Sequence, residues 1–252
     1  MTSAKTKSAT PPDTYFLPEG YKINPVLMTM DSESGDTYWH ARRLNDAYNY
    51  QYHVYKYAMD VIQKHNVKRV IDVGCGPAIK LGLFHDKYPD LDITGIDQDH
   101  PIEYCKSTHK YGRWLVDDFE NPRSDIPNLE ADLVINADVI EHVMNPDNVL
   151  NYIAHRMAPD GLALISTPDR ARNYGHDKME SGHPAHIREW TKDEFAQYLQ
   201  SRGWEILEHF HLPGMRAGMN HAYIRSLAYH ILKGKPKHMD YNQVVLAKAP
   251  KG

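Results

Sequence analysis

The run VIDVGCGPA at residues 70–78 constrains the fold of this chain more than any other stretch. Its first four residues are mostly β-branched and apolar, which is typical of a strand buried on both faces. Gly74 and Gly76 then end the strand, because glycine allows a sharp turn and lets another molecule approach without a Cβ in the way. Apolar residues at helical spacing follow over residues 78–88. The run therefore predicts a strand, a tight turn and a helix whose first N–H groups face a bound molecule.

The second informative stretch is LDITGI at residues 91–96, which predicts another strand and is followed by Asp97. That acid lies about 20 residues beyond the glycines, where a nucleoside-binding α/β unit places a carboxylate on the ribose hydroxyls. The alternative is a surface aspartate that ends a strand. A dinucleotide fingerprint would need a third glycine where Ile79 stands, so the sequence disfavours a hydride-transfer cofactor.

These residues resemble the first motif of the class I S-adenosylmethionine (SAM) dependent methyltransferases, an acid followed by glycines at alternate positions. Asp72, Gly74 and Gly76 match it, and Ala78 stands at the third small position. The resemblance extends over residues 70–204. It implies an α/β, Rossmann-like fold with a seven-stranded, mostly parallel sheet and helices on both faces. It also implies an antiparallel last strand, an N-terminal helical cap and a C-terminal lid insertion.

The resemblance further implies that SAM lies across the ends of the first strands. The strand predicted at residues 113–116 ends in two acids, and Asp118 with Phe119 matches the pair that flanks the adenine. Asp117 would take that role if the register differs by one. The implied cofactor-binding residues are Asp72, Gly74, Cys75, Gly76, Asp97, Gln98, Asp118, Phe119, Asn136 and Ala137.

The rest of the chain alternates strand and helix patterns, which favours a parallel sheet covered on both faces. Further strands are predicted at 131–137, 162–166, 204–211 and 243–248, with a turn at 159–161, and helices at 100–109, 147–157, 191–199 and 222–232. Thr191 and Glu194 form the T-x-x-E pattern of a capping box.

Three regions are expected from composition and pattern. They are a disordered tail and wrapping segment at 1–35, a helical cap at 36–65, and the SAM-binding domain at 66–252 with insertions at 167–189 and 213–241. In the cap, Tyr48, Tyr52 and Tyr55 share one helical face. These tyrosines either pack with their hydroxyl tips in water or line the mouth of the cofactor and substrate site.

Composition excludes several classes of protein. The 252 residues carry a net charge of −4 and no basic tract, so a nucleic-acid partner has no electrostatic support. No apolar run approaches the roughly 20 residues of a membrane helix, and the first residues lack the apolar region of a signal peptide. Two cysteines form no disulfide framework and suit a reducing compartment, so we expect a cytoplasmic protein.

The candidate catalytic residues are histidines, because a hydroxyl acceptor benefits from a general base whose pKa lies near neutrality. His142 follows the fourth strand, whereas His183 and His186 lie in the long loop after the fifth. A second interpretation uses the sequence D-x-x-E-H of Asp138, Glu141 and His142, which resembles a divalent-metal site in a subset of these methyltransferases. His183 or His186 would complete that site. A metal is the less favoured of the two interpretations.

The sequence therefore predicts a methyltransferase that moves a methyl group from SAM to a hydroxyl of a small molecule. Residues 166–170 (STPDR) and 183–195 (HPAHIREWTKDEF) resemble bacterial methyltransferases that tailor sugars and polysaccharides. Two alternatives are a SAM-binding regulatory protein without turnover and a nicotinamide-dependent oxidoreductase. The oligomeric state is not indicated by the sequence.

Overall fold

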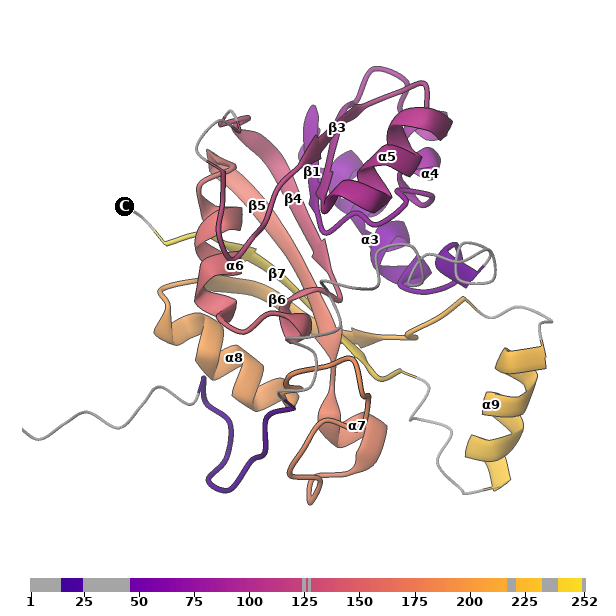
Figure 1. Cartoon of the computed structure of the whole chain (residues 1–252), viewed down its shortest axis with the longest axis vertical. Helices are drawn as coiled ribbons and strands as arrows, with labels where there is room; N and C mark the ends of the chain where they lie inside the picture. Colours follow the sequence, from indigo (N-terminus) through magenta and orange to yellow (C-terminus); the bar gives the residue numbers. More distant parts are fainter. Residues whose placement is uncertain are drawn as a thin grey trace, which may run out of the picture.

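The protein is built around one seven-stranded sheet (Figure 1). The computed structural model describes residues 15–24, 46–123, 126, 128–216, 221–232 and 240–250. The strands are β1 (Arg69–Val73), β2 (Asp92–Asp97), β3 (Arg113–Val116), β4 (Ala131–Ala137), β5 (Met157–Pro168), β6 (Glu205–Leu212) and β7 (Asn242–Lys248). Their order across the sheet is β3-β2-β1-β4-β5-β7-β6.

The pairing directions confirm the predicted fold. β1 pairs in parallel with β2 and β4, whereas β7 runs antiparallel between β5 and β6. Six strands therefore point the same way and end at one edge of the sheet. The chain moves outward from β1 to β3 and then returns to place β4 on the other side of β1. Ligands of open α/β sheets bind at such a switch point, outside the carboxyl ends of the strands.

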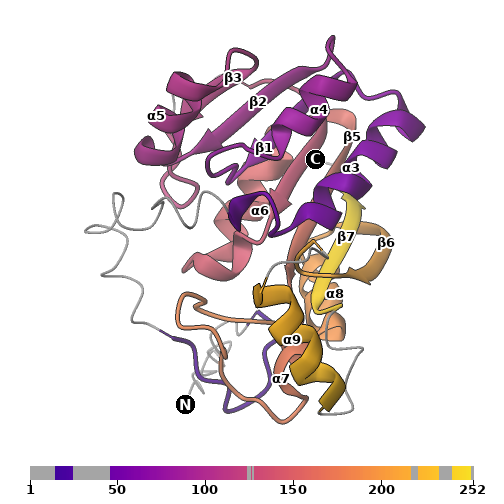
Figure 2. The ribbon, with the colours of Figure 1, turned by 90° about the vertical axis from the view of Figure 1, so that its right-hand side faces the viewer.

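Helices cover both faces of the sheet (Figure 2). One face carries α3 (Tyr52–His65), α4 (Leu81–Lys87) and α5 (Asp99–Thr108), and the other carries α6 (Pro146–Ala154) and α8 (Lys192–Ser201). The shorter elements are η2 (Ile140–His142) after β4, and α7 (Arg170–Tyr174) after β5. The insertion between β6 and β7 contains α9 (His221–Leu232), which stands apart from the sheet in Figure 1.

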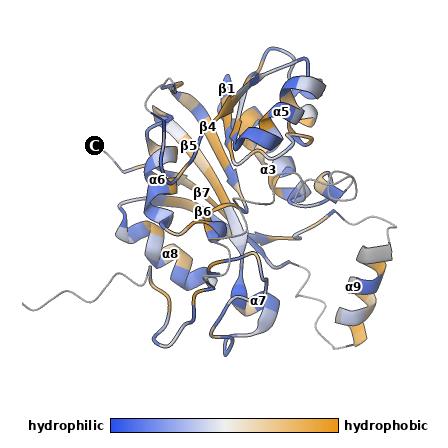
Figure 3. Ribbon diagram, viewed as in Figure 1, coloured by the Kyte–Doolittle hydropathy of each residue, from blue (hydrophilic) through white to orange (hydrophobic). Residues whose placement is uncertain are grey.

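Alternating residues of the central strands form two cores. On β1, Val70 packs under α3 and α4, whereas Ile71 belongs to the core beneath α6 and α8. Leu133 and Val134 repeat this alternation on β4. Figure 3 shows that β1 and β4 are largely hydrophobic along their length. Because both faces are covered, these strands contain continuous apolar runs.

The structure corrects the predicted start of the helix after the glycine turn. That helix begins at Leu81, three residues later than the pattern predicted. Ala78 has a φ of 54°, in the left-handed region that glycine occupies without strain. The turn therefore continues through the third small position of the motif, and the helix begins only after it.

The structure also corrects the region before the fifth predicted strand. The helix predicted at 147–157 ends at Ala154, and β5 already begins at Met157. The turn predicted at 159–161 is an irregularity within β5, where the register with β4 shifts. The first residues of the two strands, Ala131 and Met157, still pair, and this pairing keeps the irregular segment in the sheet.

The capping box at the start of α8 is confirmed. The Thr191 hydroxyl accepts a hydrogen bond from the Glu194 N–H at 3.4 Å, and Glu194 accepts one from the Thr191 N–H at 2.8 Å. The second carboxylate oxygen of Glu194 accepts a hydrogen bond from Arg170 at 2.7 Å. This side chain therefore begins α8 and anchors α7 at the same time.

The flanking segments are described only in part. Residues 1–14 and 25–45 lie outside the described residues, so the predicted tail and the start of the cap are not addressed, and the domain division stays a prediction. Residues 15–24 lie along the loop before α8, where the Trp190 indole N–H donates to the Tyr15 carbonyl at 2.9 Å. The insertion predicted at 167–189 is less irregular than expected, because it holds the end of β5, α7 and the buried side chain of Arg170. Within the described ranges, no helix combines the length and apolarity that crossing a bilayer requires.

Candidate functional site

The predicted glycine turn lies at the carboxyl end of β1, beside the switch point. Gly74 and Gly76 have φ values of 85° and 53°. A Cβ on Gly74 would lie 2.3 Å from the Cγ2 of Val139, so packing against the segment after β4 requires a glycine there. The N–H of Gly74 donates to the Ile96 carbonyl at 2.8 Å. The turn is therefore held between β2 and the residues that follow β4.

Asp97 is attached to this turn by its carboxylate. Its Oδ2 accepts a hydrogen bond from the Gly76 N–H at 2.7 Å, and its Oδ1 accepts one from the Gln98 N–H at 2.7 Å. Burial raises the pKa of Asp97 to about 6, although these two N–H groups oppose that shift. An ionised carboxylate has about four acceptor positions, so two remain for further donors such as ribose hydroxyls.

Two other predicted cofactor residues have different surroundings. The Cys75 side chain is buried, and burial raises the pKa of its thiol well above the usual value, so it stays protonated. Gln98 is exposed and occupies the N-cap position of α5. The Cys75 side chain thus packs within the turn and the Gln98 side chain is exposed, while the contacts of both residues with a donor stay predictions.

Asp72 is a fully buried member of the predicted site. Its Oδ2 accepts a hydrogen bond of 2.7 Å from the Tyr55 hydroxyl of α3, and its Oδ1 has no hydrogen-bond partner in the described part of the chain. Burial raises the pKa of Asp72 to about 7. The sequence placed Tyr55 on the cap but did not show that its hydroxyl reaches the acid of the first motif.

The structure separates the two acids at the end of β3. Asp117 is buried and accepts hydrogen bonds from the Tyr152 hydroxyl at 2.6 Å and from the Arg123 N–H at 2.8 Å. Asp118 is exposed, and Phe119 packs with its ring edge against Tyr152. Asp117 is thus buried and bonded within the fold, whereas the exposed Asp118 accepts hydrogen bonds from Glu120 and Asn121, and its role beside the adenine stays a prediction.

The end of β4 contributes Asn136 and Ala137, both buried. The Asn136 amide donates to the Val73 carbonyl at 2.9 Å, and its Oδ1 has no partner among the described residues. Asp138 follows with a φ of 55° and accepts hydrogen bonds from Ser166 at 2.6 Å and from Gln51 at 2.9 Å. Asp138 therefore links β4, β5 and the helical cap.

The three candidate histidines lie together. The ring centroid of His186 is 4.8 Å from that of His142 and 4.3 Å from that of His183. One potential ligand atom from each of Glu141, His142 and His186 lies within 4.8 Å of the other two. Asp138 is not part of this group, so of the D-x-x-E-H residues only Glu141 and His142 are brought together with a distal histidine, and the metal site stays a prediction. His183 is exposed at the outer side of His186.

Hydrogen bonds at Nδ1 orient both inner histidines. The Nδ1 of His142 lies 2.5 Å from the Ala185 carbonyl, which can only accept, so Nδ1 carries the proton of the neutral ring. The Nδ1 of His186 lies 2.5 Å from Glu189. When Glu189 is ionised it also can only accept, so the lone pair of each neutral ring is then on Nε2. Burial lowers the pKa of His186 to about 3, which keeps this ring neutral.

Glu141 completes the group from a fully buried position. One carboxylate oxygen accepts a hydrogen bond from the Thr167 hydroxyl at 2.9 Å, and Oε1 has no partner among the described residues. Burial raises the pKa of Glu141 well above its usual range. A buried carboxyl oxygen and two imidazole nitrogens thus converge, which suits either proton transfer or a divalent cation.

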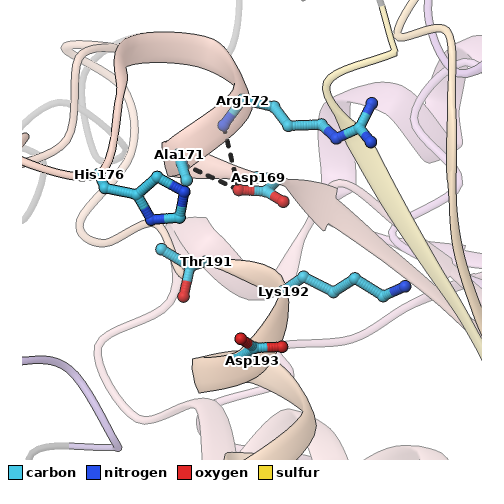
Figure 4. A pocket seen from close by; sticks show the side chains of 7 residues that line it. All are labelled: Asp169, Ala171, Arg172, His176, Thr191, Lys192 and Asp193. Carbon is cyan, nitrogen blue, oxygen red and sulfur yellow. Dashed lines mark hydrogen bonds between the residues drawn. The ribbon is translucent and has the colours of Figure 1, made fainter.

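A separate cavity of about 390 Å³ lies between α7 and the start of α8. Figure 4 shows its lining, in which Arg172 and Lys192 extend in the same direction while His176 points into the gap between the two helices. None of the sequence-predicted site residues lines this cavity. The chemistry suggested by the sequence is therefore elsewhere, at the ends of β1, β2 and β4.

The residues at the end of β1 fit the methyl donor. The buried oxygens Asp72 Oδ1 and Asn136 Oδ1 have no partner in the described part of the chain, and both are acceptors. Their strands are neighbours, because Asp72 pairs with Ile135. Buried acceptors without donors are costly unless a bound molecule supplies the donors, and SAM carries an ammonium group. The individual contacts of the predicted cofactor residues stay predictions.

Comparisons with known proteins agree with this arrangement. A family model described as "Methyltransferase domain" matches residues 48–209. A probable S-adenosylmethionine-dependent methyltransferase of Mycolicibacterium smegmatis is 25% identical over 138 residues, which are 54% of this chain and 52% of that protein. A ubiquinone biosynthesis O-methyltransferase of Glaesserella parasuis is 28% identical over 113 residues, 41% and 46% of the two chains. A trans-aconitate 2-methyltransferase of Escherichia coli is 26% identical over 149 residues, 56% and 58% of the two chains.

Solved structures share the fold. The plantazolicin methyltransferase BamL, in complex with a triazolic desmethylPZN analog and SAH, has a TM-score of 0.57 and 16% identity, covering 79% of this chain and 84% of that one. This likeness concerns the fold alone. This chain spans about half the length of the three curated relatives it matches. Because the family model covers well over half of the residues, the chain belongs to the SAM-dependent methyltransferases.

Proposed function

We propose that this enzyme transfers the methyl group of SAM to a hydroxyl of a small polar molecule such as a sugar. The observation that supports this most is the group of Glu141, His142 and His186 at the end of β4, beside the expected donor site. A hydroxyl is a poor nucleophile until its proton is removed or its oxygen is polarised, and this group offers the side chains for either step. The ubiquinone relative is by its name an O-methyltransferase, which adds support from similarity.

In the first mechanism, His142 is the general base. SAM supplies a methyl group already activated as a sulfonium, so the protein has to orient the acceptor, exclude water and accept one proton. The Ala185 carbonyl holds the proton of His142 on Nδ1, which leaves the Nε2 lone pair to take the hydroxyl proton. His186 packs edge-on against His142 and restricts the rotation of its ring.

A second mechanism uses a divalent cation, and a specific observation favours it. Histidines that bind metals usually donate their other N–H to a carbonyl or carboxylate, as His142 does toward Ala185 and as His186 does toward Glu189 when that carboxylate is ionised. The buried Oε1 of Glu141 would be the third ligand atom. A cation held there would polarise the acceptor hydroxyl and leave coordination positions for it.

Chelation distinguishes the two mechanisms. We expect turnover to survive exhaustive EDTA treatment, because a histidine base requires no cation. Loss of turnover on chelation, with recovery in Mg²⁺ or Mn²⁺, would instead establish the metal mechanism. Metal content of the purified protein, measured by mass spectrometry before and after EDTA, gives an answer that does not depend on the acceptor.

Substitutions provide an independent test. His142→Ala should lower turnover by about 10²-fold or more under either mechanism. Glu141→Gln should cost much less with a histidine base, but about as much as His142→Ala if both bind a cation. His155→Ala is the matched control and should leave turnover unchanged. This histidine is exposed at the end of α6, and its ring is hydrogen-bonded to the Asn151 carbonyl of the same helix.

The acceptor is identified by a screen of sugars and nucleotide-sugars with methyl-labelled SAM. Label in a sugar hydroxyl would support the proposal, and label in a nitrogen or carbon position of another compound would replace it. If the protein binds SAM but transfers no label to any compound class, the role of a SAM-binding regulator becomes the better description.

A further inference from the structure

The helical cap is connected to the first motif by a hydrogen bond that has no role in the chemistry described above. Tyr55 is almost completely buried in α3, and its ring packs against Phe84 of α4 with 5.9 Å between centroids. Its hydroxyl donates to Asp72 Oδ2 at 2.7 Å. Tyrosine is rarely buried to this depth without a partner for its hydroxyl, and here the partner is the acid of the first motif.

This hydrogen bond leaves Asp72 half satisfied. Oδ1 of the same carboxylate is buried and has no hydrogen-bond partner among the described residues. A carboxylate in that condition is unstable unless a positive group approaches it. Tyr55 takes one acceptor position of Oδ2, so Oδ1 is the oxygen that keeps both of its acceptor positions for a bound cation.

Four titratable groups bear on the charge of Asp72, and one of them is the buried thiol of Cys75 in the glycine turn. Tyr55 faces it from α3, Lys80 faces it from the residues just before α4, and Asp97 faces it from the end of β2. The Lys80 ammonium donates to the Ala47 carbonyl at 2.8 Å and lies 4.9 Å from the centre of the Tyr55 ring. Lys80 thus connects the cap to the turn, while Asp97 adds a like charge on the far side.

The position of Asp72 in the sheet indicates which part of SAM it would meet. Asp72 pairs with Ile135 on β4, next to the implied cofactor-binding residue Asn136, whose buried Oδ1 also has no partner among the described residues. Asp97, the residue expected at the ribose, is on the other side of β1, at the end of β2. The methionine part carries an ammonium group, which is the cation that a buried carboxylate oxygen would accept.

We propose that Tyr55 is a positioning residue for the methyl donor: it holds Asp72 Oδ2, so that Oδ1 is presented to the ammonium group of SAM. Tyr55 then strengthens the binding of SAM indirectly, through Asp72, and does not itself touch SAM. This inference rests on SAM binding at the first motif and is independent of the identity of the acceptor.

The test compares two ligands by calorimetry, S-adenosylhomocysteine and its analogue in which hydrogen replaces the α-amino group. Tyr55→Phe keeps the ring and removes the hydroxyl. We expect this variant to bind S-adenosylhomocysteine about tenfold more weakly and to bind the desamino analogue as the parent does. Equal losses for both ligands, or no loss for either, would overturn the proposal.

Two further variants keep the test interpretable. Tyr57→Phe is the matched control on the same helix, because the Tyr57 hydroxyl donates to Glu208 of β6 at 2.8 Å and not to Asp72. This variant should bind S-adenosylhomocysteine and the desamino analogue as the parent does. Asp72→Asn retains an acceptor for Tyr55 but removes the charge, and it should lose affinity for S-adenosylhomocysteine only. If Tyr55→Phe fails to fold, the two-ligand comparison with Asp72→Asn tests the step on which the role of Tyr55 depends, and equal losses for both ligands in that variant would overturn the proposal. If the parent binds neither ligand, SAM binding at this site is itself refuted.

The pH dependence of binding adds a readout that a purely structural role would not change. Affinity for S-adenosylhomocysteine should rise as Asp72 ionises, near pH 7. The Tyr55 hydroxyl stabilises the carboxylate, so Tyr55→Phe should move this rise to higher pH. A pH profile that is identical in parent and variant would contradict the proposed role.

Discussion

At the scale of residues, Asp97 carries the sharpest expectation. It accepts hydrogen bonds from the Gly76 and Gln98 N–H groups, and its remaining acceptor positions suit ribose hydroxyls. Asp97→Ala should weaken the binding of SAM roughly tenfold or more, because hydrogen bonds to a carboxylate contribute about 1.5–3 kcal/mol. Calorimetry measures this directly. Asp99→Ala, two residues further on in the first turn of α5, is the control and should bind SAM as the parent does.

At the scale of elements, the Glu194 side chain both caps the start of α8 and pairs with the buried Arg170. Thr191→Ala removes one capping hydrogen bond and should lower the free energy of unfolding by about 1 kcal/mol. Glu194→Ala removes the other capping bond and also leaves the buried guanidinium of Arg170 without its carboxylate, so it should cost distinctly more. Denaturant titration of both variants measures the two costs. Equal costs would mean that the ion pair adds nothing.

The insertion between β6 and β7 makes a second prediction at this scale. The side chains of Ile224, Ile231 and Leu232 on α9 are exposed, so these apolar side chains are not covered by the described part of the protein. If α9 acts as a lid, its amide hydrogens should exchange faster than those of β4 and become protected when SAM and acceptor bind together. Hydrogen exchange measures both states. Unchanged exchange in α9 would exclude the lid role.

At the scale of the whole molecule, buried acids predict an unusual dependence of stability on pH. Burial raises the pKa of Asp72 from 3.8 to about 7, so between these pH values the folded state holds a proton that the unfolded state releases. Stability from this group is therefore present at low pH and is lost as pH rises toward 7, by up to about 1.4 kcal/mol per pH unit. His209 acts oppositely, because burial lowers its pKa to about 4 and stability falls as pH drops below 6.5.

A comparison with Asp72→Asn isolates the contribution of Asp72 from that of His209. Between pH 5 and 7, the free energy of unfolding of the parent should fall by roughly 2 kcal/mol relative to that of Asp72→Asn, which has no such proton to lose. Denaturant titrations at pH 5, 6 and 7 measure the difference. Parallel curves for the two proteins would show that Asp72 does not titrate in this range.

The sequence by itself determined the features that depend on neighbouring residues. The β-branched run of β1, the glycine turn and the capping box are each specified within about ten residues, and all three lie where they were predicted. The alternation of strands and helices likewise predicted a mostly parallel sheet covered on both faces, because parallel strands need crossover connections that pack on the sheet, whereas the order of the strands came from the structure. Family resemblance then identified SAM, which the family comparison confirmed.

Only the tertiary structure decided which distant side chains meet. Tyr55 and Asp72 are 17 residues apart, and His142 and Ala185 are 43 apart, so no periodicity within either segment indicates their contact. The same holds for the two acids after β3, because only the fold shows that Tyr152 of α6 bonds the buried Asp117 while Asp118 is exposed. Which acids are buried, and hence which pKa values shift, follows from how helices cover the sheet. Packing sets these contacts, and sequence spacing alone does not contain them.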